Sequence, residues 1–257
     1  MWRSVACVVY VMLSVLEIGC GPGNPGKGTV DARATVPDAD NRPTPVVTVM
    51  VGDSTMATFD DPPPDRPTLT GWGQVFGDYF DTLVSVHNMA VSGESSRSYV
   101  DDGYWDAART QIDTGTFVFI QFGHNDQSDD ARHTDPATTY RDQLVAMVSD
   151  TIALGGVPIL VSPVARRTFV DGELVDTLQP YADGARAVAE SRGTAFVDLH
   201  ALSMALYVQL GAVGSEFLSA SAVDTTHFSR DGAIAIAGLV VENLPAPAAS
   251  LAEHRAR

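Results

Sequence analysis

Cysteine and positive charge are both scarce in this chain of 257 residues. The only two cysteines, Cys7 and Cys20, lie close to the start. The rest of the chain therefore offers no disulfide, no cysteine nucleophile and no cysteine-based metal site. Lys and Arg number 16 against 32 Asp and Glu, which gives a formal net charge of -16. Such a surface repels nucleic-acid backbones and anionic lipid headgroups, so nucleic acid is not an expected partner.

Long apolar runs are also missing. The run at 5–16 has the length of a signal-peptide core and is too short to span a bilayer comfortably. The end of the run and Cys20 resemble a bacterial lipoprotein signal, in which a cysteine after a small residue is lipidated. Glu17 stands where such signals usually carry leucine, so a plain secretory signal and an uncleaved anchor stay open as alternatives. We expect a signal peptide at 1–20 and a flexible Gly/Pro-rich linker at 21–45.

These features predict an extracytoplasmic protein, either a cell-envelope lipoprotein or a secreted or periplasmic one. Membrane attachment is expected only through a lipid on Cys20. Hydrophobic residues make up 45% of the chain and charged residues 19%, which suits a packed domain. We place that domain at 46–244, followed by a tail at 245–257 that we expect to fray. A monomer is the expected state.

The body alternates two kinds of pattern. Short continuous apolar runs predict strands that are buried on both faces. Longer periodic or Ala-rich segments predict helices. Together they predict an α/β fold, a three-layer α/β/α sandwich with a mostly parallel five-stranded sheet. The predicted strands are 46–51, 82–87, 117–122, 157–161 and 195–197, and the predicted helices are 139–154, 180–191 and 231–243.

A serine follows the first predicted strand directly, in the run Gly52-Asp53-Ser54-Thr55. The glycine allows a tight turn, and a helix after the turn would place its N-terminus behind Ser54. In a parallel sheet, functional residues gather in the loops at the carboxyl ends of the strands. Taken alone, however, a serine here is more often a helix cap than a nucleophile.

Polar loops follow the second and third predicted strands. In the first, at 88–96, the backbone N–H of Gly93 is a candidate donor to an oxyanion, because glycine permits close approach. In the second, at 123–126, the side-chain amide of Asn125 is a candidate second donor. Either loop can equally be a polar turn that satisfies its own backbone groups.

The last block is Asp224-Thr225-Thr226-His227, just before the final predicted helix. A carboxylate three residues before a histidine can bond one imidazole nitrogen and leave the other free to accept a proton from Ser54. A helix-capping aspartate beside an ordinary histidine would give the same pattern.

The four blocks are more informative together than apart. They arrive as a nucleophile, two oxyanion donors, an orienting carboxylate and a base, each at the end of a strand or the start of a helix. A metal site built from His124, Asp126, Asp224 and His227 is an alternative. It would leave the serine and both oxyanion donors without a role. We therefore do not predict a metal site.

These blocks resemble the SGNH (GDSL-type) hydrolase superfamily, named for its invariant Ser, Gly, Asn and His. Here those are Ser54, Gly93, Asn125 and His227. The detail is similar to one branch, the rhamnogalacturonan acetylesterases and their bacterial pectin-deacetylating relatives, and extends over 46–244. The features that point to this branch are Gly-Asp-Ser-Thr in place of Gly-Asp-Ser-Leu, Gly71-Trp72-Gly73, the run 95–99, the run 122–126 and Asp224-x-x-His227-Phe-Ser-x-x-Gly232.

The resemblance implies a flavodoxin-like α/β/α domain that removes acetyl groups from carbohydrate without a cofactor. It implies Ser54 as the nucleophile, with Asp224 and His227 as its partners. The oxyanion hole would consist of the backbone N–H groups of Ser54 and Gly93 and the side chain of Asn125.

One departure from the branch concerns charge. Many relatives have arginine directly after the glycine of the second block, where this chain has Glu94. Arg97 keeps a positive charge nearby, and Arg166 and Arg167 are candidate replacements, although both can equally be a solvated pair in a loop. The candidate substrate contacts are Glu94, Arg97, His124 and Trp72.

The leading hypothesis is a carbohydrate O-deacetylase acting on pectin-like rhamnogalacturonan or another acetylated polysaccharide. A second hypothesis keeps the triad but changes the substrate to a lipid, thioester or aryl ester, which a deep apolar acyl pocket would favour. A third is a glycan-binding lipoprotein that lacks catalysis. It is disfavoured because Ser54, Asp224 and His227 are all present.

Overall fold

The computed structural model describes residues 45–256. The predicted signal peptide, the lipidation site Cys20 and nearly all of the predicted linker lie outside these residues. Within them, a central parallel sheet has five strands in the order β2-β1-β3-β4-β7. The strands are β1 (Val46–Gly52), β2 (Val84–Asn88), β3 (Phe117–Gln121), β4 (Val157–Val161) and β7 (Ala195–Val197).

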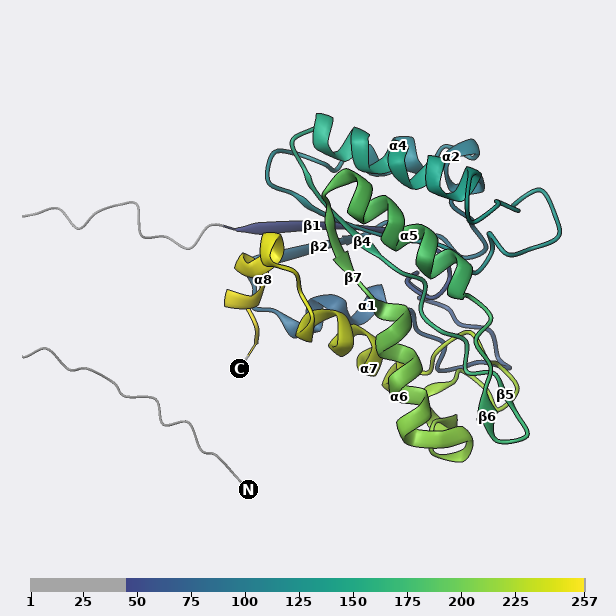
Figure 1. Ribbon diagram of the computed structural model, residues 1–257. Coiled ribbons are helices and arrows are strands. Elements are labelled where there is room, and N and C mark those ends of the chain that lie inside the picture. Colours follow the sequence, from purple (N-terminus) through teal and green to yellow (C-terminus); the bar gives the residue numbers. More distant parts are fainter. Residues whose placement is uncertain (1–44, 257) are drawn as a thin grey trace, which may run out of the picture. The chain divides into compact units, whose positions relative to one another are not determined.

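Helices cover both faces of this sheet, as Figure 1 shows. One face carries α2 (Ser98–Asp101), α3 (Tyr104–Arg109), α4 (Thr139–Ala153) and α5 (Gln179–Arg192). The other carries α1 (Trp72–Phe76), the first turn of α6 (Leu199–Gly214), α7 (Arg230–Glu242) and α8 (Ala249–Glu253).

Side chains that alternate along the central strands fill the two cores. Val49 and Val51 pack toward α3 and α4, while Met50 between them packs toward α1 and α7. All three side chains are fully buried. The central strands therefore carry apolar side chains on both faces rather than at every second position only, because both faces are covered. The predicted three-layer α/β/α fold is confirmed.

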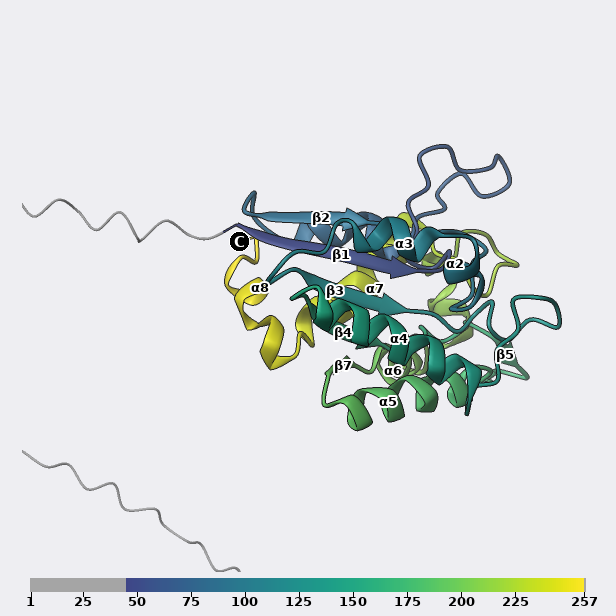
Figure 2. The same cartoon turned by 90° about the horizontal axis from the view of Figure 1, so that it is seen from above.

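The strand order decides where a site can form. From β1 the chain moves to β2 on one side and later returns past β1 to β3 on the other. At such a reversal the loops separate and leave a crevice at the carboxyl ends of the two central strands. Figure 2 shows the loops after β1 and β3 projecting from this edge.

Two parts of the architecture carry little sequence signal. Helix α6 is apolar on almost every side (LHALSMALYVQL), so it shows no single stripe. Strands β5 (Phe169–Val170) and β6 (Glu173–Leu174) are two residues each and join through Asp171-Gly172, where both φ angles are positive (51° and 88°). Neither α6 nor this hairpin belonged to the predicted elements.

The prediction that the tail at 245–257 frays was wrong. The segment forms a 3-10 turn at Ala246–Ala248 and then α8. Ala248 and Leu251 are both fully buried in the core beneath the sheet. A segment rich in proline and alanine shows no clear apolar pattern in the sequence. Two buried apolar side chains are nevertheless enough to anchor so short a segment.

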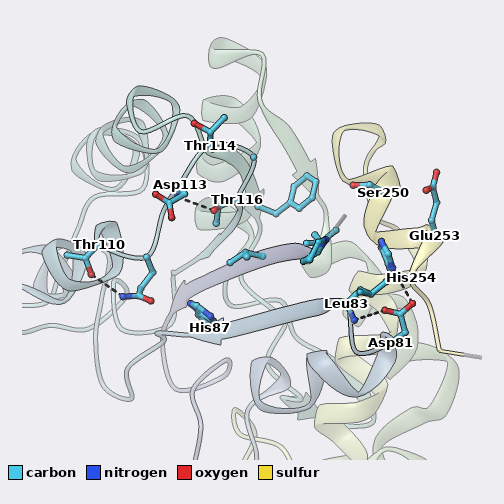
Figure 3. Close-up of a pocket in the computed structure, with 16 residues that line it drawn as sticks. Asp81, Leu83, His87, Thr110, Asp113, Thr114, Thr116, Ser250, Glu253 and His254 are labelled. Atoms are coloured by element: carbon cyan, nitrogen blue, oxygen red, sulfur yellow. Dashed lines mark hydrogen bonds and ion pairs between the residues drawn. The ribbon is translucent and has the colours of Figure 1, made fainter. Parts of the chain in front are cut away.

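A cavity of about 860 Å³ opens at the amino ends of the strands, beside α8 (Figure 3). Asp81, Asp113 and His254 are among its lining residues, and Asp81 and His254 pair on one side of it at 3.2 Å. Ser54 does not line this cavity, because it lies at the other end of the strands. Within residues 45–256, no single helix is long and apolar enough to cross a membrane.

Candidate active site

Ser54 lies in a tight turn directly after β1. The backbone N–H groups of Met56 and Ala57 both donate to the carbonyl oxygen of Asp53, which closes the turn. No helix follows directly, because α1 begins at Trp72 with Gly71 as its N-cap. Ser54 therefore caps no helix, and the expectation of a helix N-terminus behind the serine was wrong. Its side chain is instead free to face another segment.

That segment is the loop before α7. His227 Nε2 lies 3.0 Å from Ser54 Oγ, although 173 positions separate the two residues. His227 Nδ1 lies 3.0 Å from Asp224 Oδ2 and 3.2 Å from Oδ1. A carboxylate accepts, so Nδ1 carries the imidazole proton and Nε2 is left to accept one. The helix cap of α7 is Ser229, whose Oγ accepts from the N–H of Gly232 at 3.1 Å, so Asp224 is not a capping residue.

The loop also fixes the carboxylate of Asp224. Its Oδ1 accepts the backbone N–H groups of Thr226 and His227 at 2.9 and 2.8 Å. Burial raises the pKa of Asp224, but these two bonds and the neighbouring imidazole outweigh burial and hold the pKa below its ordinary value. The carboxylate is therefore ionised and held in one orientation toward His227.

A buried polar chain supports the serine turn from below. Trp72 Nε1 donates to Gln121 Oε1 at 2.8 Å, and Gln121 Nε2 donates to Thr55 Oγ1 at 2.7 Å. Thr55 Oγ1 and its backbone N–H then donate to Asp53 Oδ1 at 2.7 and 2.9 Å. Trp72 has no exposed surface, so the prediction of Trp72 as a substrate contact was wrong. Its indole packs in the core and its N–H helps to position the turn.

His124 occupies the other side of Asp53. Its Nδ1 lies 3.1 Å from Asp53 Oδ2, and both side chains are buried. Burial raises the pKa of Asp53, but the charge and hydrogen bond of His124, together with the two hydrogen bonds from Thr55, outweigh burial, so the pKa lies below its ordinary value. Because the His124 side chain is only 2% exposed, it meets Asp53 rather than an open cleft. Asp53, which directly precedes Ser54, is thus held by Thr55 on one side and by His124 on the other.

The predicted oxyanion donors come together on the loops after β2 and β3. Asn125 Nδ2 donates to the carbonyl oxygen of Glu94 at 2.9 Å. Gly93 has φ of +93°, and a Cβ placed there would meet open space, so the backbone is accessible at this point. Among residues 45–256, the backbone N–H groups of Ser54 and Gly93 donate to no protein acceptor. Both remain available to a ligand oxygen.

Asp126 ties these two loops together, which sequence reasoning did not anticipate. Its carboxylate accepts the backbone N–H of Ser96 at 3.1 Å, and it also accepts the hydroxyl groups of Ser96 and Thr134 at 2.5 and 2.7 Å. Burial raises the pKa of Asp126, although these hydrogen bonds oppose the shift. Asp126 is therefore committed to the loop contacts and is not directed at His227.

Two arginines that border the triad differ in what they contact. Arg66 Nη1 lies 3.3 Å from Asp224 Oδ2 and 3.4 Å from His227 Nδ1. Arg166 donates to Thr226 Oγ1 and, at 3.2 Å, to the carbonyl oxygen of His124. Arg66 was missed from the sequence, because an arginine in a proline-rich loop has no distinguishing pattern. Both place positive charge beside the triad despite the acidic composition of the chain.

The remaining candidate residues, Arg167, Glu94 and Arg97, differ in how deeply they are buried. Arg167 is buried, and it donates to Ser219 Oγ at 2.7 Å and to the Ala212 carbonyl at 3.1 Å, so it is a structural residue and not a solvated one. Glu94 and Arg97 are half-buried beside Gly93. In the described part of the chain, no three His, Cys, Asp or Glu side chains gather as metal ligands would.

Comparison with known proteins assigns this arrangement to a family. The model of the GDSL-like lipase/acylhydrolase family matches residues 50–233. Rhamnogalacturonan acetylesterase RhgT of Bacillus subtilis (strain 168) is 34% identical over 223 residues, which are 82% of this chain and 94% of the relative. A probable rhamnogalacturonan acetylesterase of the same strain, YesY, is 30% identical over 76% of this chain and 90% of its own length.

Solved structures agree on the fold. An acetylxylan esterase of Geobacillus stearothermophilus, Axe2, superposes with a TM-score of 0.60 over 77% of this chain and 94% of its own, at 21% identity. The chain belongs to the GDSL-like lipase/acylhydrolase family. It is a carboxylic ester hydrolase of the SGNH type, as its four sequence blocks predicted.

Proposed function

We propose that this esterase removes O-acetyl groups from carbohydrate, with rhamnogalacturonan or another acetylated pectin-like polysaccharide as its substrate. The observation that carries the proposal is the line from Asp224 through His227 to Ser54, with donor–acceptor distances of 3.0 Å at both steps. Relatives named for rhamnogalacturonan deacetylation span most of the chain and support the choice of substrate.

In the proposed mechanism Ser54 Oγ attacks the acetyl carbonyl while His227 Nε2 takes the hydroxyl proton. Asp224 keeps the Nδ1 proton in place and stabilises the imidazolium that forms. The N–H groups of Ser54 and Gly93 and the side chain of Asn125 bind the negative oxygen of the tetrahedral intermediate. His227 then gives its proton to the sugar oxygen as the bond between that oxygen and the acetyl carbon breaks, so the sugar leaves with a free hydroxyl group. Water activated by the same imidazole releases acetate from Ser54.

The groups that border the triad favour a polar substrate over a lipid. Arg66 and the backbone N–H of Thr226 both contact Asp224 of the triad. Arg166 in turn donates a hydrogen bond to the side chain of Thr226. Charged and hydroxylated groups suit a hydrated sugar, whereas an acyl chain would need an apolar wall. Positive charge beside the triad also suits an acidic sugar, although Glu94 opposes it locally.

Acetate release from a panel of acetylated polysaccharides tests the proposal, with Ser54→Ala as the matched control. We expect release from acetylated rhamnogalacturonan by the wild type and none above background by Ser54→Ala. Equal release by the two proteins would show that Ser54 is not the nucleophile. Preference for a lipid or aryl ester over every glycan would favour the non-glycan esterase. A phosphonate probe that fails to label Ser54 would support a protein that only binds glycan.

The proposed cell-envelope location depends on Cys20 and stays a proposal. Palmitate labelling of the wild type and of Cys20→Ala tests it. Label that enters only the wild type would support a lipid anchor, and equal labelling of the two would contradict it.

A further inference from the structure

The oxyanion donors of the proposed mechanism come from separate loops. Gly93 follows β2 and Asn125 follows β3. Neither loop contains regular structure at these positions, so their mutual placement depends on cross-links. An oxyanion hole requires its donors to be fixed before the reaction, because reorganisation during the reaction would raise the barrier.

One guanidinium contacts both donor residues. Arg132 Nη1 donates to the carbonyl oxygen of Gly93 at 3.1 Å and to Asn125 Oδ1 at 3.3 Å. The second contact determines which way the amide of Asn125 faces. The positive guanidinium of Arg132 attracts the side-chain oxygen Oδ1 of Asn125. On the other side, the backbone carbonyl oxygen of Glu94 accepts a hydrogen bond from Asn125 Nδ2 at 2.9 Å. Only one of the two amide orientations satisfies both neighbours.

Arg132 is itself held in place. Asp130 accepts two charge-assisted bonds, at 3.0 Å from Arg132 Nε and at 2.7 Å from Nη2. Such bidentate pairs fix the plane of the guanidinium. This pair holds the pKa of Asp130 near 2, so the carboxylate is ionised at any working pH. The Arg132 side chain therefore reaches Gly93 and Asn125 from a defined position.

The segment that carries Arg132 is anchored at both ends. The N–H of Thr134 donates to the carbonyl oxygen of Asp126 at 3.1 Å. The Tyr181 hydroxyl lies 2.8 Å from the Asp126 carbonyl oxygen and 2.7 Å from that of Thr134. The segment between 126 and 134 is thus a closed loop whose base rests on α5, and Arg132 points from it back to the oxyanion donors.

We propose that Arg132 is a positioning residue that fixes both oxyanion donors, Gly93 and Asn125, in their reactive orientation. The inference rests on the oxyanion roles given to these residues in the proposed function. Asp130 neutralises most of the charge of Arg132, so the effect works through geometry rather than through direct attraction of the oxyanion. Loss of a whole donor costs about 10²–10³ in kcat, and a donor displaced by about 1 Å costs up to about 10².

The test compares Arg132→Gln with Arg109→Gln. Arg109 is a matched control, because its side chain is 41% exposed against 38% for Arg132 and it also pairs with aspartates, far from the site on α3. Two readouts avoid any contribution from glycan binding: hydrolysis of p-nitrophenyl acetate and the rate at which a small neutral phosphonate labels Ser54. Ester hydrolysis passes through a tetrahedral oxyanion bonded to Ser54, and phosphonate labelling passes through a five-coordinate phosphorus whose phosphoryl oxygen also gains negative charge, so both rates depend on the oxyanion donors.

We expect Arg132→Gln to lower kcat for the small ester by about tenfold to a hundredfold, with KM little changed. The phosphonate labelling rate should fall in parallel, while Arg109→Gln matches the wild type. Arg132→Lys keeps the charge but cannot contact Asp130, Gly93 and Asn125 together, so it should recover only part of kcat.

Asp130→Asn leaves the arginine in place and loosens it, and it serves if Arg132→Gln does not fold. It should lower both rates less than Arg132→Gln does. Unchanged rates in Asp130→Asn and Arg132→Lys would overturn the proposal. So would a rise in KM for acidic glycan with normal rates on the small ester, which would make Arg132 a substrate contact. An inactive wild type, or a wild type no faster than Ser54→Ala, would instead refute the proposed function.

Discussion

Asp224→Asn tests the proposed triad most directly. The asparagine oxygen can keep the two backbone bonds that Asp224 Oδ1 accepts from Thr226 and His227. Its NH₂ group then takes the position of Oδ2 and faces His227 Nδ1 at about 3 Å and Arg66. Two donors would then face each other at the shorter distance of 3.0 Å, while Oδ1, 3.2 Å from Nδ1, already accepts the two backbone bonds. The imidazole must therefore move its proton to Nε2, where it faces Ser54 and can no longer accept the hydroxyl proton.

The expected loss follows from this change of tautomer. An aspartate-to-asparagine change that leaves geometry intact but imposes the wrong tautomer lowers kcat by about 10⁴ in a serine protease. Asp224 is partly exposed, with 12% of its side chain accessible, so we expect a fall of about 10³–10⁴, or about 4–5.5 kcal/mol of transition-state stabilisation. KM should change little, because Asp224 reaches the substrate only through His227. Initial rates with p-nitrophenyl acetate provide the assay.

Asp176→Asn is a matched control. Asp176 Oδ1 accepts the backbone N–H groups of Leu178 and Gln179 and pairs with His200 Nε2, all at 3.0 Å. It therefore reproduces the aspartate–histidine pattern of the site without Ser54. Both variants should keep their fold by circular dichroism, and only Asp224→Asn should lose activity. Retention of more than about a tenth of the wild-type kcat by Asp224→Asn would refute the reasoning.

Two further predictions concern stability. A Cβ at Gly232 would lie 2.0 Å from the carbonyl oxygen of Leu218, so Gly232→Ala should lower the free energy of unfolding in urea by about 1–3 kcal/mol and shift the loop that carries His227. A change below about 0.5 kcal/mol would contradict the close packing. The pKa of Asp53 is lowered in the folded state, so its pair with His124 stabilises the fold above about pH 4 and this stability is lost as pH falls through the folded pKa. The free energy of unfolding of Asp53→Asn should be about 3 kcal/mol lower than that of the wild type at pH 6. Between pH 5 and 2 the variant should lose less further stability than the wild type does. Acid-unfolding curves of the two proteins that run parallel would contradict this prediction.

The strands and long helices were predictable because their patterns are local. The run Val46–Gly52 has valine or methionine at five of its seven positions, on both faces of the strand, and this pattern indicates a strand with two covered faces. Helix α4 runs over Thr139–Ala153 and was predicted to within one residue. The fate of the tail was not predictable, because Leu251 is buried in a core cluster to which both α7 and the sheet contribute side chains.

In the candidate site, the reacting residues were predictable from the sequence, but the residues that hold them in place were not. The residue types of Ser54, Asn125 and His227, each placed after a strand or before a helix, indicated esterase chemistry. The same reasoning misplaced Trp72, because an aromatic residue between two glycines looks the same whether it borders a cleft or fills the core. Arg66 and Arg132 lie in loops without periodicity, and nothing local distinguishes them from solvated arginines.

The sequence by itself determined the fold class, the family and the order of the reactive groups, because strand periodicity and short motifs are properties of neighbouring residues. Only the tertiary structure decided which groups meet. Ser54 and His227 lie 3.0 Å apart across 173 positions, and a single arginine contacts both loops that carry the proposed oxyanion donors. Such contacts depend on how separate loops converge at the carboxyl edge of the sheet, and no local pattern records that convergence.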